Sequence, residues 1–68
     1  MKDDWSRVYS SSQAYQIEIV KSILSDNQIE SYSIDRRDSS YIGLGEIELF
    51  VKAEDVILAR LIIDTGKL

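Results

Sequence analysis

Three segments rich in β-branched and aromatic residues alternate with two segments of helical apolar spacing, in the order β-α-β-β-α. This order predicts an α+β, ferredoxin-like domain with a three-stranded sheet and two helices on one face. The strand-helix-strand crossover must be right-handed, and the third strand then lies between the first two. With 68 residues, the whole chain 1–68 forms a single domain.

Residues 4–10 are predicted as the first strand, and the face carrying Trp5, Arg7 and Tyr9 is the heavier one. Three serines follow at 10–12, and a serine oxygen can accept the unpaired N–H groups of a first helical turn. The first helix is therefore expected over residues 12–26. Its core side carries Gln13, Ile17, Val20 and Leu24.

Asn27 is expected as the left-handed residue that ends this helix, because no glycine is available there. The second strand is expected over residues 29–36. Its alternation predicts Tyr32 and Ile34 inward, with the polar residues outward: Ser31, Ser33 and Asp35.

Residues 46–52 alternate cleanly and predict the third strand, with Ile47, Leu49 and Val51 on its buried face. Its other face carries Glu46, Glu48, Phe50 and Lys52. The second helix is expected over residues 53–64, facing the core with Val56, Ala59, Ile62 and Ile63. The predicted core as a whole is Val8, Ile17, Val20, Leu24, Ile34, Ile47, Leu49, Val51, Ala59 and Ile63.

Both helices carry apolar residues that this core does not use. The first has Tyr15 and Ile19 opposite its core side, and the second has three more: Ile57, Leu58 and Leu61. A helix that is apolar over most of its circumference is normally buried over most of it. We therefore expect these five residues to form an oligomer interface, as a homodimer or, as the alternative, a trimer. The first strand is also an uncovered sheet edge, and such edges invite pairing with another chain.

Composition limits the function classes. A net charge of −4 argues against nucleic acid as a partner. There is no Cys and no His, so a zinc site of thiolate or imidazole ligands is excluded, and no cofactor or metal is expected. No apolar run approaches a membrane span and no signal segment is recognisable. We expect a cytoplasmic protein without a membrane partner.

The loop between the second and third strands is dense in hydrogen-bond donors. Arginine forks, hydroxyls and glycine backbone N–H groups together could hold a phosphate or a carboxylate. The candidate residues are Arg36, Arg37, Ser39, Ser40, Gly43 and Gly45. The alternative is a solvated hairpin in which Asp35 and Asp38 neutralise the arginines and the glycines serve the turn.

Two other patterns favour plainer interpretations. Glu46 and Glu48 are spaced as a carboxylate pair, but alternation explains them, and no nucleophile with a base is recognisable. These glutamates, with Asp35 and Asp38, could bind a hard cation through their oxygens, but no Ca²⁺-loop spacing is present. Trp5, Tyr9 and Phe50 beside an arginine could stack single-stranded bases, but aromatic packing or an interface is the favoured explanation.

The sequence resembles a small bacterial family, the putative prokaryotic signal-transducing proteins. The resemblance lies in Trp5 with residues 8–10, the helical run 17–24, residues 29–31, the segment 38–51, and Glu54, Asp55 and Ala59. It implies a ferredoxin-like fold related in shape to nitrogen-regulatory signal-transducing proteins, and it brings no catalytic residue. The chain departs from the family pattern at Asn27 and Gln28, where many relatives have a glycine before the isoleucine.

Taken together, these patterns predict a non-enzymatic regulatory or interaction module that acts as a homo-oligomer. It would sense a small anionic ligand, or contact a protein partner, through the 36–45 loop. The alternative is a purely structural association domain without a small-molecule ligand. An enzyme ranks last.

Overall fold

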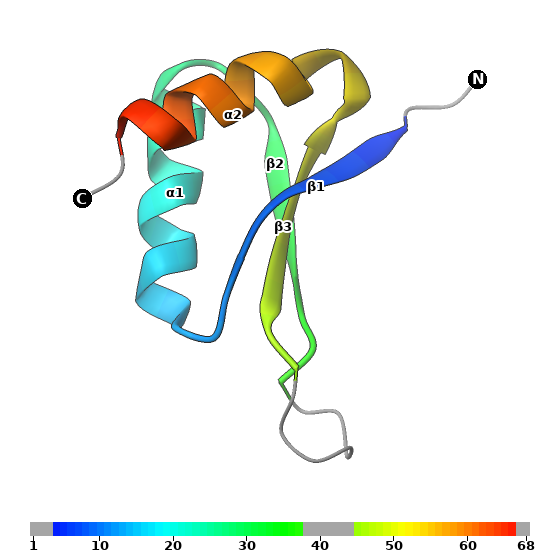
Figure 1. The fold of residues 1–68 in the computed structure, drawn as a ribbon, viewed down its shortest axis with the longest axis vertical. Coiled ribbons are helices and arrows are strands. Elements are labelled where there is room, and N and C mark those ends of the chain that lie inside the picture. Colours follow the sequence, from blue (N-terminus) through cyan, green and yellow to red (C-terminus); the bar gives the residue numbers. More distant parts are fainter. Residues whose placement is uncertain (1–3, 38–44, 67–68) are drawn as a thin grey trace.

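The computed structural model describes residues 4–37 and 45–66. Figure 1 shows the predicted element order, β-α-β-β-α, with both helices on one side of a small sheet. The elements are β1 (Trp5–Ser11), α1 (Ala14–Asp26), β2 (Ser31–Asp35), β3 (Ile47–Lys52), a 3₁₀ turn (Ala53–Asp55) and α2 (Val56–Thr65). The predicted ferredoxin-like arrangement is confirmed.

β3 is the central strand of the sheet, and it pairs antiparallel with β1 and with β2. Its alternation follows the sequence prediction, because Ile47, Leu49 and Val51 are buried and the intervening residues are only partly covered. These three side chains join the helices in one core, which also contains Ile17, Leu24, Ile29 and Ala59. The predicted core residues Val8, Val20 and Ile63 pack against this core as partly buried neighbours.

Hydrogen bonds from flanking residues fix both ends of α1. At the start, the N-cap residue is Gln13 and no side chain caps the first turn, so the expected serine cap is wrong. The Ser11 hydroxyl instead accepts a bond from the Gln13 N–H, just before the helix, at 3.0 Å. At the end, Gln28 N–H donates to the Ser25 carbonyl and Ile29 N–H to the Leu24 carbonyl, both at 2.9 Å. This pattern is a Schellman motif, in which the first residue after the cap is left-handed.

The left-handed residue is Gln28, with φ of 63°, whereas Asn27 has φ of −102°. The prediction of Asn27 for this role is therefore wrong by one residue. Asn27 instead caps through its side chain, whose Nδ2 donates to the Ile23 carbonyl at 2.8 Å. Gln28 directly precedes Ile29, at a positive φ that a glycine would adopt without strain.

β1 contains an irregularity that the alternation rule did not predict. Arg7 lies opposite Phe50 and Tyr9 lies opposite Leu49, so Val8 is an extra residue in β1. A bulge of this kind reverses the facing of the residues beyond it. Trp5 and Arg7 therefore share the open face with Phe50, while Tyr9 packs against the core, so the predicted grouping of Tyr9 with Trp5 and Arg7 is wrong.

The predicted facing of β2 is also wrong. Tyr32 lies opposite Phe50 and Ile34 lies opposite Glu48, which places both on the open face of the sheet. Ser31 and Ser33 take the helix-covered side, opposite the buried residues of β3. Ile34 is therefore not a core residue. Ile29, just before β2, is buried in its place with 4% of its surface exposed.

α2 faces the core as predicted, with Ala59 fully buried and Val56, Ile62 and Ile63 packed around it. The five residues predicted to be surplus are all exposed: Tyr15, Ile19, Ile57, Leu58 and Leu61. Within the described parts of the chain, no helix has the length and hydropathy to cross a membrane.

Candidate ligand- and partner-binding surfaces

An ion trio crosses all three strands on the open face of the sheet. Glu48 of β3 accepts a bond from Arg7 Nη1 of β1 at 3.1 Å and one from Arg36 Nε, just after β2, at 2.9 Å. The Glu48 side chain is only 18% exposed, while both arginines are more than half exposed. Two guanidinium groups share one carboxylate, so the trio keeps a net positive charge in an otherwise acidic chain.

The arginines keep two carboxylates ionised. The hydrogen bond from Arg36, with the positive charges of Arg36 and Arg7, lowers the pKa of Glu48 below its ordinary value, against the opposing effect of desolvation. The side-chain and backbone hydrogen bonds from Arg37 likewise lower the pKa of Asp35. Neither carboxyl group is therefore poised to exchange a proton near neutral pH, as a general acid or base would be.

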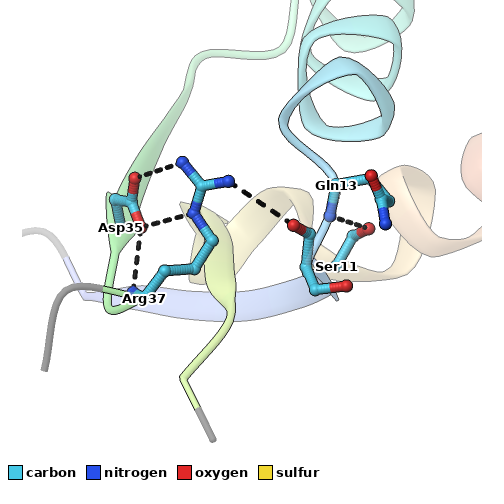
Figure 2. Close-up of polar contacts among 5 residues, drawn as sticks. Ser11, Gln13, Asp35 and Arg37 are labelled. Carbon is cyan, nitrogen blue, oxygen red and sulfur yellow. Dashed lines mark hydrogen bonds and ion pairs between the residues drawn. The ribbon is translucent and has the colours of Figure 1, made fainter. Parts of the chain in front are cut away.

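Arg37 points to a different part of the molecule from Arg36. Its Nε and Nη2 grip both oxygens of Asp35 at 3.0 and 2.9 Å, and its backbone N–H adds a third bond to the same carboxylate. Figure 2 shows that the guanidinium also reaches the turn between β1 and α1, where Nη1 donates to the Ser12 carbonyl at 3.5 Å. Arg37 thus ties the base of the β2–β3 hairpin to the start of α1.

Only half of the predicted anion site can be placed. Ser39, Ser40 and Gly43 lie outside the described residues. Gly45 stands at the base of the hairpin, where a methyl group in place of its hydrogen would overlap the Arg36 carbonyl oxygen. This close approach of two backbone segments requires a glycine at position 45. The two candidate arginines do not share a partner. Arg36 and Arg7 both bond Glu48, whereas Arg37 bonds Asp35.

Aromatic rings lie next to the ion trio on the open face. The rings of Tyr32 and Phe50 are stacked, with centroids 5.2 Å apart and planes at 12°. Trp5 meets Tyr32 edge-on, with centroids 4.8 Å apart and planes at 65°. Such pairs stabilise a sheet across its strands. The predicted aromatic packing is thus present, with Tyr32 in the position expected for Tyr9.

A second surface lies on the helix side of the sheet. A cleft of about 460 Å³ opens between β1, α1 and α2, and a neighbouring depression of about 520 Å³ lies between β1 and α2. The cleft is mostly apolar and includes Tyr15 and Ile19, which are 60% and 42% exposed. Leu61, 58% exposed, lines the depression. Three of the five predicted interface residues therefore border these two hollows.

The carboxylates considered for a cation do not form a common site. Asp38 lies outside the described residues, while Asp35 and Glu48 are bound to arginines. Among the residues of 4–37 and 45–66, no three potential ligands come together around a metal-sized space.

A family model described as "Putative prokaryotic signal transducing protein" matches residues 5–67 of the chain. The chain belongs to this family. No curated protein and no solved structure is significantly similar to it. Membership of the signal-transducing family therefore comes with a description of role and without an assigned ligand.

Sequence reasoning missed the partnership of Arg36 with Arg7 in this signal-transducing family member. Consecutive residues at the end of a strand point to opposite faces, so Arg36 and Arg37 were bound to diverge. With the facing of β2 that the structure shows, the same rule places Arg36 on the face of Glu48. Sequence reasoning could not place it there, because it took Ile34, and with it Arg36, to face inward.

Proposed function

We propose that this signal-transducing family member is a non-enzymatic, cytoplasmic regulatory module that works as a homo-oligomer, most simply a dimer. Its 36–45 segment receives a small anion, and the association of subunits passes the signal on. The observation that carries the proposal is the exposure of apolar residues on both helices of so small a domain. Ile57 is 84% exposed and Tyr15 is 60% exposed.

Exposed apolar residues in this number need a physical explanation. A domain of this size obtains only about 3–5 kcal/mol from its own core, and association with another subunit is a common further source of stability. Contiguous apolar surface on a soluble protein usually marks an interaction site. Closed two-fold assemblies are the commonest homo-oligomers, which favours a dimer over a trimer.

Anion sensing is supported by the ion trio. Each bond to Glu48 uses one of the three nitrogens of its guanidinium group. Arginine groups already fixed by a carboxylate lose less side-chain entropy when a phosphate or carboxylate binds. Arg36 is the first residue of the 36–45 segment, so an anion bound to its guanidinium would also lie beside the start of this segment.

Self-association is tested by light scattering. Wild-type protein is expected to be dimeric at micromolar concentration, and the double variant Leu58→Glu/Leu61→Glu monomeric, because two charges cannot be buried in an apolar contact. Ser22→Glu/Ser25→Glu places the same two charges at exposed positions of α1 and should leave the dimer intact. A monomeric wild type would contradict the homo-oligomer.

Anion binding is tested with inorganic phosphate and nucleoside triphosphates as probes, read by thermal shift and by the fluorescence of Trp5, the sole tryptophan. The Arg36→Gln/Arg37→Gln variant should bind at least tenfold more weakly, equivalent to about 1.4 kcal/mol. We expect Arg36→Gln alone to account for most of this loss. Arg37→Gln is the matched control, because all three nitrogens of its guanidinium are engaged by Asp35 and the Ser12 carbonyl, whereas Arg36 bonds Glu48 through Nε.

The stability of both single variants should change by less than about 1 kcal/mol, since the arginine of each ion pair is about half exposed to solvent. Unchanged binding in the double variant would place the anion elsewhere. If no probe binds while the protein remains dimeric, the purely structural association domain is the correct alternative.

A further inference from the structure

We propose that the second copy pairs along the free edge of β1 and covers the cleft beside it, so that the two sheets join into one. This inference rests on the proposed self-association and identifies the surface that carries it.

In the part of the chain that the structure describes, β1 has β3 as its neighbour on one side and no strand on the other. An unpaired edge presents a row of backbone N–H and C=O groups, which is a template for another strand. In Figure 1, β1 crosses in front of the other strands with this edge uncovered.

Apolar side chains lie beside that edge. The cleft and the depression described above share Tyr9 and Ile63, so the apolar lining continues along β1 from one hollow to the other. Val8 and Leu61 border the depression, and Tyr15 and Ile19 border the cleft. β2 (Ser31–Asp35), the other edge strand, contributes no residue to either hollow. Apolar contacts would therefore accompany backbone pairing at β1.

The charges on α2 fit a second copy of the same chain. Arg60 and Asp64 both line the depression beside β1, one turn apart on α2. A two-fold axis through this surface sets two α2 helices antiparallel to each other. Arg60 then faces Asp64 of the partner subunit, and the same pair forms again across the axis. A surface with both signs at this spacing is self-complementary, as an isologous interface requires.

The experiment exchanges these charges. Arg60→Glu leaves two acidic groups at the surface, and Asp64→Lys leaves two basic groups, so each variant alone repels its own copy. Each should associate at least about tenfold more weakly than wild type by light scattering. An equimolar mixture of the two variants should associate as heterodimers with near wild-type affinity. The double variant Arg60→Glu/Asp64→Lys should recover association by itself.

A second measurement reports on the strand. Amide hydrogen exchange across Trp5–Ser11 should slow as the protein concentration rises, while exchange across Ser31–Asp35, the other edge strand, should not. Circular dichroism melting checks that the charge variants still fold, as expected for two exposed positions.

The outcomes separate this inference from the proposed function. If wild type is monomeric, self-association itself fails. If Leu58→Glu/Leu61→Glu disrupts a dimer that neither charge variant weakens, the protein self-associates through another surface. Concentration-independent exchange of β1 in a dimeric protein would also overturn the strand pairing.

Discussion

Leu49→Ala is expected to leave most of the protein unfolded at 25 °C. Leu49 is fully buried in the central strand, where its Cα lies between those of Tyr9 and Ser33. Truncating a buried leucine costs about 2–5 kcal/mol, because the cavity adds to the lost transfer free energy. The core of a domain this small supplies about the same amount. Urea denaturation followed by circular dichroism measures the loss.

Ile57→Ala is the matched control for this experiment. The same type of truncation at a side chain that is 84% exposed should change the unfolding free energy by no more than about 0.5 kcal/mol. Both variants are best measured below the concentration at which the protein associates. A Leu49→Ala variant as stable as Ile57→Ala would mean that the central strand does not bury its alternate residues.

Gly45→Ala is expected to cost about 1–3 kcal/mol, although it adds only a methyl group. That methyl group would overlap the carbonyl oxygen of Arg36 on the opposite arm of the hairpin. The two arms are joined there by a bond from Arg36 N–H to the Glu46 carbonyl at 3.2 Å. The arms must separate to admit the methyl group, and this bond weakens. Thermal melting measures the cost.

Gly66→Ala provides the comparison at a second glycine. A methyl group there would lie 3.2 Å from the Ile62 carbonyl oxygen and 3.7 Å from Ile23 Cδ1, so only a small adjustment is needed. Restricting the unfolded chain offsets part of that adjustment, and the net change should stay within about 1 kcal/mol. Equal effects at both glycines would show that the hairpin base is not closely packed.

The elements with the strongest periodicity were predictable from sequence. β3 alternates without interruption, and both helices face the core with the apolar residues that their 3.6-residue spacing indicates. Gln13, expected on the core side of the first helix, is wrong, because it is the exposed residue just before α1. The facing of β1 was not predictable beyond Arg7, because the bulge at Val8 carries no glycine or other local signal. It arises from pairing with β3, which is a tertiary effect.

The predicted facing of β2 was wrong for a different reason. Hydrophobicity favoured Tyr32 and Ile34 as its inward residues, but it does not separate a buried face from one covered by aromatic neighbours. Tyr32 stacks on Phe50 across the open face, and that packing decides the orientation of the strand. At the candidate site, local contacts such as the Arg37–Asp35 pair were foreseeable, whereas the contact of Glu48 with Arg7 joins residues 41 positions apart.

The shared carboxylate of Glu48 gives the two proposed events a thermodynamic connection. It holds Arg36, where an anion would bind, and Arg7, which belongs to the strand whose free edge would receive the second copy. An anion bound to Arg36 beside Glu48 would also attract Arg7, the second cation of the trio. Thermodynamic linkage then requires the two effects to be equal. If the bound anion changes the dimerisation constant by some factor, dimerisation changes the affinity for the anion by the same factor. The sheet itself, through one glutamate, would be the element that couples sensing to assembly.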